Sequence, residues 1–144
     1  MATPQGGYLV SQAHRLSSQA LDQTLAAHGC EALSGIQGRV FYVLLSSENG
    51  ACLSEIAEKT ALPKPTLTGV VDRMEKAGIV RREAVAGDRR KTRIVLTEQA
   101  DELAHAYETV SAEMNERFFA GFSDREREEL AGYLERIIAN LSNQ

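Results

Sequence analysis

Apolar positions along this chain follow two different periods. Between residues 8 and 28, 36 and 47, and 65 and 77 they recur every third or fourth residue, the spacing of a helix with a buried face. From 79 to 85 and from 92 to 96 they alternate, which predicts two half-buried strands. Helical spacing returns after residue 97 and continues to the last residues. The pattern therefore predicts a mainly α protein with a small β hairpin inserted between helices.

Short sequence signals indicate where the helices begin. The S-x-x-Q of residues 34–37 and the S-x-x-E of residues 123–126 predict capping boxes, in which two side chains bond the first backbone N–H groups. Ser54 and Thr97 are predicted to cap two further helices. Residues 51–53 are expected to pair with the hairpin as a short strand. The first seven residues are expected to form a loose tail.

The helix of residues 65–77 is closely bounded by its sequence. Pro65 suits the first helical position, where a backbone N–H would have no partner. Each proline also disfavours the α conformation in the residue before it, so Leu62 and Lys64 are predicted to be non-helical. Gly78 follows the last apolar position and is expected to end the helix.

This helix has two different faces. Leu67, Val70, Val71 and Met74 form a buried stripe at helical spacing. The opposite face has small or hydroxyl residues first and long cations further on, as a helix entering the DNA major groove requires. The candidate contact residues are Lys64, Pro65, Thr66, Thr68, Gly69, Arg73 and Lys76.

The segment between the two predicted strands, AGDRRKT, is expected to be a turn. Gly87 and Asp88 are typical turn residues, and Arg89, Arg90 and Lys91 make the tip cationic. The negative potential of the minor groove attracts arginine, so a cationic tip beside a recognition helix favours DNA binding. We expect Arg90 to enter the groove, and Asp88 to hold the hairpin or this arginine in place.

The charge distribution agrees with a nucleic-acid partner although the chain is acidic overall. Its formal net charge is −4. Residues 64–93 contain nine Lys or Arg against four Asp or Glu, a net charge of +5, which leaves −9 for the remainder. Such asymmetry directs one face toward a polyanion.

The run from residue 53 to 97 resembles the MarR family of bacterial transcription regulators. The matching residues are LSEIAEKTALPKPTLTGVVDRMEKAGIVRR and then DRRKTRIVLT, which contains an Asp-x-Arg and a strand ending in Leu-Thr. Pro63 and Lys64 stand where the family often has a Ser or Thr cap, and Ala100 stands where it often has Gly. The resemblance implies a winged helix-turn-helix over residues 35–97, flanked by dimerisation helices in residues 1–34 and 98–144.

The resemblance also implies how such a protein works. Members form two-fold dimers that bind a pseudo-palindromic operator, which implies a homodimer on double-stranded DNA and a ligand-responsive repressor. They usually respond to small aromatic acids or to oxidants at the joint between the dimer helices and the DNA-binding part. The candidate pocket residues are Tyr8, His14, Arg15, Arg39, Phe41 and Tyr42, and Cys30 is the candidate redox residue. For each aromatic the alternative is a core position, and for Cys30 it is a small buried side chain.

Other classes of protein find less support in the sequence. The outer face of residues 65–77 is neither acidic nor apolar, which argues against a winged helix used only for protein–protein contact. We expect no enzyme, cofactor or metal, because the sequence has no nucleophile–base pair, phosphate loop or Cys/His cluster. It also has no apolar run near 18 residues and no recognisable secretory signal, so a cytoplasmic location away from the membrane is expected.

Overall fold

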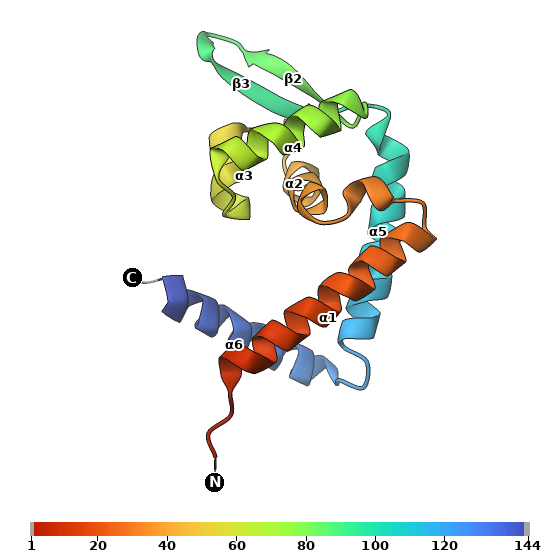
Figure 1. The fold of residues 1–144 in the computed structure, drawn as a ribbon, viewed down its shortest axis with the longest axis vertical. Helices are drawn as coiled ribbons and strands as arrows, with labels where there is room; N and C mark the ends of the chain where they lie inside the picture. The colour runs from red at the N-terminus through yellow and green to blue at the C-terminus, as the bar shows by residue number, and fades with distance from the viewer. Residues whose placement is uncertain (1, 143–144) are drawn as a thin grey trace.

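The computed structural model describes residues 2–142, and over that range it is mainly α with three short strands, as predicted. Figure 1 shows a β hairpin at one end of the molecule and the first and last helices at the other. The elements in chain order are α1 (Gly6–Ala27), the 3₁₀ turn η1 (Glu31–Leu33), α2 (Ile36–Leu45), β1 (Ala51–Cys52), α3 (Leu53–Thr60), α4 (Lys64–Lys76), β2 (Val80–Val85), β3 (Asp88–Leu96), α5 (Ala100–Phe118) and α6 (Asp124–Ser142).

The three strands form one antiparallel sheet in the order β1–β3–β2. Ala51 pairs with Ile94, and Val80 pairs with Leu96, so the short strand expected at residues 51–53 is present over its first two residues. Ile94 lies on the central strand and is fully buried. The hairpin of β2 and β3, which we call the wing, is thus attached at its base to the helix-turn-helix of α3 and α4.

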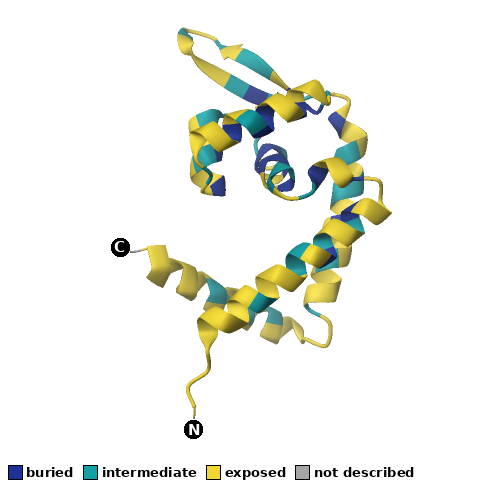
Figure 2. Cartoon of the chain, viewed as in Figure 1, coloured by how far each residue is buried: buried dark blue, intermediate teal, exposed yellow. Residues whose placement is uncertain are grey.

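One apolar core joins α2, α3, α4 and the base of the sheet. The predicted stripe of α4 is confirmed, because all four of its residues are buried against Phe41 of α2, Ile56 of α3 and the strand residues Val80 and Ile94. Figure 2 shows the buried residues concentrated in this part of the chain. The core therefore fixes which face of α4 remains available to solvent.

Several predicted helix starts are wrong. The box at residues 34–37 is not formed: α2 begins at Ile36 after Gly35, which has a φ of 66° and provides no side-chain cap. Helix α3 begins one residue before Ser54, and the backbone N–H of Cys52 donates to the Glu55 carboxylate at 3.4 Å. Neither helix is therefore capped by the predicted serine: α2 follows the positive φ of Gly35, and α3 starts at the end of β1 with Cys52 and Glu55 at its cap.

Thr97 is not the cap of α5 either. Its hydroxyl donates to the carbonyl oxygens of Gly78 at 2.5 Å and Ile79 at 3.3 Å, so it links the end of β3 to the turn after α4. Gly78 ends α4 as predicted, with a φ of 79° and its N–H bonded to the Glu75 carbonyl oxygen. Lys64 is helical although it precedes Pro65, which contradicts the expectation from the proline.

The terminal helices bury much less surface than the core. Helix α1 starts at Gly6, two residues earlier than predicted, and packs along α5. The box at residues 123–126 is confirmed, since the backbone N–H of Ser123 donates to the Glu126 carboxylate at 2.9 Å and the N–H of Glu126 donates to Ser123 Oγ at 3.1 Å. Within residues 124–142 no side chain of α6 is fully buried. Large exposed apolar residues on the two helices include Tyr8, Leu9, Val10, Leu16, Tyr133, Ile137, Ile138 and Leu141.

The predicted apolar stripe of α6 is therefore only partly covered by its own chain. Leu130 and Leu134 are half-buried, whereas Ile137 and Leu141 are exposed. At the α5–α6 turn, Phe119 packs edge-on against Phe118 and Phe122, and the Arg127 guanidinium lies 5.4 Å from the Phe119 ring centre. Over the described range no helix is long and apolar enough to cross a bilayer.

Candidate nucleic-acid interface

The outer face of α4 is open as the sequence predicts. Lys64, Pro65, Thr66, Arg73 and Lys76 are all exposed. The helix begins after Pro63 without a side-chain cap, so the N–H groups of its first turn are not used by a side chain. These groups carry the positive end of the helix dipole, which favours an anion such as phosphate.

Two further residues of this face have specific geometry. The Thr68 hydroxyl donates to the Lys64 carbonyl oxygen at 3.0 Å, which leaves its lone pairs to accept from a partner. A Cβ atom added to Gly69 would have a single neighbour within 4 Å, Arg73 Nη1 at 3.9 Å. The backbone at Gly69 can therefore approach another molecule closely.

The two carboxylates of this helix are held by an arginine that the sequence alone does not identify as part of the site. Arg82 of β2 donates from Nη2 to Asp72 Oδ1 and from Nη1 to Glu75 Oε1, each at 2.6 Å. The hydrogen bond to Asp72 is the largest cause of the raised pKa of Arg82, and burial opposes it. No carboxylate is recorded against Arg73 or Lys76 among residues 2–142, so both cations remain available. In the sequence, Arg82 lies seven residues after Glu75 and ten after Asp72, and this spacing is the only local trace of the arrangement.

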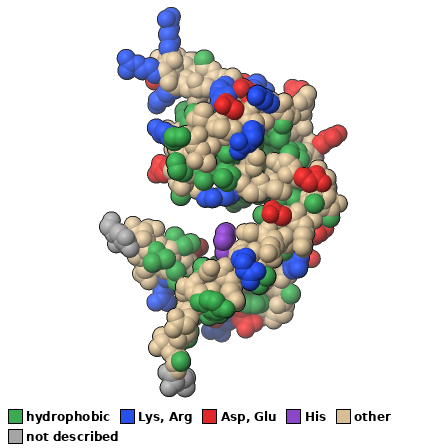
Figure 3. All heavy atoms as spheres, viewed as in Figure 1, with side chains coloured by type: hydrophobic (Ala, Val, Ile, Leu, Met, Phe, Trp, Pro, Cys, Tyr) green, Lys and Arg blue, Asp and Glu red, His purple; other side chains and the backbone are tan. Residues whose placement is uncertain are grey.

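The wing differs from its predicted form. The turn consists of Ala86 and Gly87 alone, and β3 already begins at Asp88. Ala84 pairs with Thr92 but Val85 pairs with Asp88, so Arg89, Arg90 and Lys91 form a bulge on β3 rather than the turn tip. All three side chains are exposed, and Figure 3 shows Lys and Arg side chains gathered at the far end of the hairpin.

Asp88 holds the backbone of this bulge. Its carboxylate accepts the backbone N–H of Arg90 at 2.9 Å, and no ion pair with the Arg90 guanidinium is recorded in the described chain. Of the two roles predicted for Asp88, the carboxylate therefore has the first: it holds the backbone of the hairpin and does not hold the Arg90 side chain. The Arg90 guanidinium lies exposed, with no carboxylate partner among residues 2–142.

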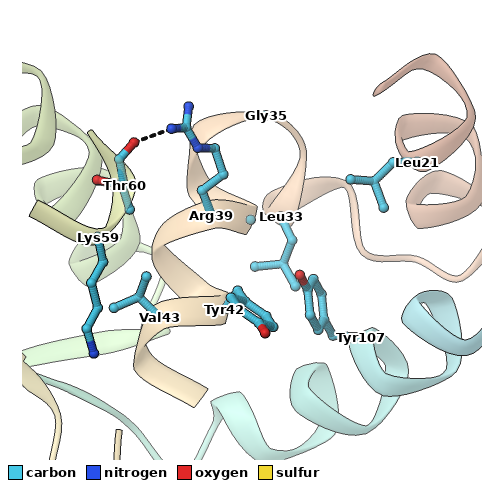
Figure 4. A pocket seen from close by; sticks show the side chains of 10 residues that line it. Leu21, Leu33, Gly35, Arg39, Tyr42, Val43, Lys59, Thr60 and Tyr107 are labelled. Carbon is cyan, nitrogen blue, oxygen red and sulfur yellow. Dashed lines mark hydrogen bonds between the residues drawn. The ribbon is translucent and has the colours of Figure 1, made fainter. Parts of the chain in front are cut away.

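A cavity lies where the first helix meets the winged helix-turn-helix. It has a volume of about 250 Å³ and is mostly apolar, with two cations and two phenols at its edge. Its lining, labelled in Figure 4 except for Gly38, is Leu21, Leu33, Gly35, Gly38, Arg39, Tyr42, Val43, Lys59, Thr60 and Tyr107. The Arg39 guanidinium donates to the Thr60 carbonyl oxygen at the end of α3. Burial raises the pKa of the Tyr107 phenol above its ordinary value.

The predicted pocket residues are only partly brought together. Arg39 and Tyr42 line this cavity, and His14 lines a neighbouring hollow that also includes Arg39. Phe41 is wrong as a pocket residue, because it is fully buried and packs edge-on against Tyr107, with ring centres 5.5 Å apart. Tyr8 and Arg15 lie exposed on α1 and line neither hollow. Lys59 and Tyr107 line the cavity but were not predicted.

Cys30 is a buried side chain rather than an accessible thiol. It is 1% exposed, and burial, followed by the nearby Glu31 carboxylate, raises the pKa of the thiol. A redox-active cysteine needs the opposite shift and access to solvent. Within residues 2–142, no group of three or more His, Cys, Asp or Glu side chains is placed to hold a metal ion.

Comparison with known proteins agrees with this architecture. A sequence model of the MarR family matches residues 33–91. The HTH-type transcriptional regulator FarR of Neisseria gonorrhoeae is 34% identical over 79 residues, which are 54% of this chain and 52% of that protein. The alignment thus spans about half the length of this curated relative.

Solved structures match over nearly the whole chain. The transcriptional regulator PA3341 is 34% identical, with a TM-score of 0.83, and the match covers 96% of this chain and 98% of that one. The Staphylococcus aureus MepR–DNA complex is 22% identical, with a TM-score of 0.84 and coverage of 96% and 99%, a likeness of fold. The helix order, the wing and these matches together show that the chain belongs to the MarR family of transcriptional regulators, which are not enzymes.

Proposed function

We propose that this MarR-family chain regulates transcription by binding double-stranded DNA with α4 in the major groove and the wing in the minor groove. The observation that carries the proposal is the pairing of two neighbouring surfaces. The outer face of α4 exposes Arg73 and Lys76 while Arg82 holds its carboxylates, and the β3 bulge exposes three further cations. The structural neighbour MepR was solved as a complex with DNA, which supports the same use of this fold.

The most direct test is selection of bound sequences from a pool of random duplexes. The wild-type chain should enrich a two-part, approximately palindromic sequence, and its affinity for that duplex should fall steeply with salt because bound phosphates release counterions. A winged helix that serves only protein–protein contact would enrich nothing and would elute from heparin at low salt. That outcome would reject DNA binding.

We infer that the DNA-binding form is a two-fold homodimer assembled through α1, α5 and α6. The exposed apolar residues on α1 and α6 lie at the end of the molecule away from the wing, and a helix with an uncovered apolar stripe normally packs on a partner. Sedimentation at micromolar concentration should give a dimer. A well-folded monomer that still selects a two-part duplex would contradict the dimer but not DNA binding.

We also propose that the cavity beside Arg39 binds a small organic anion with an aromatic or other apolar body, and that binding releases the DNA. Arg39 and Lys59 provide positive charge, and the tyrosine pair and the leucines provide apolar walls. An anion that recruits Arg39 would remove its bond to the Thr60 carbonyl oxygen, which stabilises the end of α3.

Phenolic acids are the first compounds to screen for this release. In the wild-type chain, a bound acid should lower the affinity for the selected duplex. Arg39→Gln should abolish the response to the acid. Because it also removes the bond to the Thr60 carbonyl oxygen, it should bind the duplex more weakly than the wild type even without acid. Arg15→Gln is a matched control, because Arg15 lies exposed on α1 and lines neither hollow. If a promoter carrying the selected duplex is silenced by the protein and restored by the acid, the regulator is a repressor.

A further inference from the structure

Beyond the apolar core at its base, the wing is joined to α4 by one side chain with two hydrogen bonds. Arg82 stands on β2 beside the buried Val80, on the side of the strand that faces the helices. Asp72 and Glu75 are three residues apart on α4, so they share one face of that helix. The Arg82 fork reaches both carboxylates at 2.6 Å, and its side chain is 29% exposed.

Such an arrangement constrains orientation more than a single ion pair does. A guanidinium is planar and presents its donors in a fixed geometry, so two bonds to successive turns limit both the tilt and the sliding of β2 along α4. The neighbouring Arg81 makes no such link, because its guanidinium bonds Glu83 of the same strand at 2.8 Å. The two arginines therefore differ in what they connect, although both lie on β2 and carry the same charge.

We propose that Arg82 is a positioning residue for sequence recognition, which fixes the angle between the wing and α4 so that Arg90 and Arg73 reach their grooves together. The inference rests on the proposed DNA-binding function. The alternative role for Arg82 is only to neutralise the charges of Asp72 and Glu75. If the outer part of the wing pivots about its buried base, each surface still attracts phosphate, but the two no longer match one sequence at the same time.

Neutralisation and positioning make opposite predictions when the carboxylates are removed. The double variant Asp72→Asn with Glu75→Gln eliminates two negative charges from the DNA-facing side and keeps Arg82. Charge alone predicts tighter binding to every duplex. Positioning predicts tighter binding to random duplex but weaker binding to the selected one, with a loss of discrimination on the order of tenfold, the scale of coupling within a shared charged network.

The experiment is a set of equilibrium titrations with two labelled probes, the duplex selected by the wild-type chain and a random duplex of equal length. The variants are Arg82→Met, Arg82→Lys, the double carboxylate variant and the combination of Arg82→Met with it. Arg81→Met is the matched control, since it loses the same charge from the same strand without breaking the link to α4. Arg81→Met should lower the affinity for both duplexes by the same factor.

The combined variant decides between the two roles. If Arg82 positions the wing, the combined variant should prefer the selected duplex over the random one as weakly as Arg82→Met does. Arg82→Lys should restore less than half of the lost preference on a logarithmic scale, because an ammonium cannot make the two fixed bonds of a guanidinium. Recovery of full discrimination in the combined variant would mean that Arg82 only neutralises charge, and would overturn the inference. If Arg82→Met does not fold, the double carboxylate variant gives the answer by itself, because tighter binding to both probes is also a refutation. A wild-type chain that does not discriminate between the probes would instead reject the proposed DNA-binding function.

Discussion

The winged helix-turn-helix buries its apolar side chains within one chain, whereas the terminal helices leave many of theirs exposed. In the first region, Phe41, Ile56, Leu67 and Ile94 are all completely buried within one chain. In the second, Ile138 is 62% exposed and no described residue of α6 is fully buried. Both regions consist of amphipathic elements with comparable apolar content, so composition does not explain the difference.

The contrast indicates which region needs another molecule to be complete. A domain whose stripes all close on a common core folds to one shape by itself. A helix with an uncovered stripe gains most by pairing, and its position is then determined by the partner. In this protein the complete region carries the proposed DNA-binding face, and the incomplete region would set the distance between two such faces.

The core of the winged helix-turn-helix should respond strongly to cavity formation at Phe41. Phe41→Ala should lower the free energy of unfolding by about 3–5 kcal/mol, because it removes a fully buried ring that packs on Tyr107. Tyr42→Ala, the adjacent change, should cost within about 0.5 kcal/mol, since Tyr42 is 61% exposed. Urea denaturation measures both. Equal losses of stability in the two variants would contradict the burial of Phe41 and the exposure of Tyr42 on α2.

A charged side chain on the exposed apolar face of α6 should disrupt the proposed dimer without unfolding the helix. Ile138→Asp should leave helix content nearly unchanged but convert the dimer to monomers, because it places an unpaired carboxylate in the proposed interface. Asn140→Asp adds the same charge at a polar position of α6 and should leave the dimer intact. Sedimentation velocity distinguishes the two. A dimer that persists in Ile138→Asp would place the interface elsewhere.

On the DNA-binding face, Arg90 should matter more than its neighbours in the bulge. Arg90→Ala should weaken binding to the selected duplex by about 1–3 kcal/mol, with the greatest loss where A·T-rich flanks narrow the minor groove. Arg89→Ala should weaken selected and random duplexes alike and lower the salt slope by about one unit, as a phosphate contact would. Identical behaviour of the two variants would reduce the wing to a cationic patch.

Asp88→Ala tests whether the backbone of the bulge has to be held. The change removes a negative charge near DNA, yet it should weaken binding because the Arg90 N–H loses its acceptor. Glu83→Gln removes a negative charge from the same hairpin without touching the bulge and should tighten binding slightly. Fluorescence titration with labelled selected duplex compares them. Tighter binding in both variants would contradict the supporting role of Asp88.

Much of this division was predictable from the sequence because its causes are local. The stripe of α4, the end of that helix at Gly78 and the cap at residues 123–126 depend on residues within a few positions of one another, and all are confirmed. The wing cations were identified, but a run of polar and charged residues suggested a long turn. The bulge exists because the β3 register shifts opposite Ala84 and Val85, which pairing between strands decides.

The features that the sequence did not reveal depend on contacts between distant residues. Thr97 bonds the turn after α4 because the sheet brings the end of β3 there, and no local signal distinguishes that role from a helix cap. Phe41 and Tyr42 are adjacent aromatics, and only the packing of α2 against α5 shows which of them is core. In the sequence Arg82 is one of two adjacent arginines on β2, and only the fold places it beside Asp72 and Glu75.

The smallest expected effect concerns the beginning of α6, which is capped by its own residues. Glu126 accepts the backbone N–H of Ser123, and its own N–H donates to the Ser123 hydroxyl. The bond from the Ser123 backbone N–H to the carboxylate is the largest cause of the lowered pKa of Glu126, and a hydrogen bond from the Ser123 side chain lowers it further. A carboxyl group with a lowered pKa stabilises the folded form above its unfolded pKa, and this contribution disappears as pH falls through the folded value.

Amide hydrogen exchange in the first turn of α6 should therefore lose protection on acidification below the ordinary pKa range of glutamate, after correction for the intrinsic exchange rate. Glu126→Gln should have the lower protection already at neutral pH and should show little further change, because it has no proton to gain. Glu128→Gln, on the same helix but outside the capping box, should follow the wild-type profile. If Glu128→Gln flattened the profile as well, the acid sensitivity would belong to the charge of α6 as a whole and not to the cap that begins it.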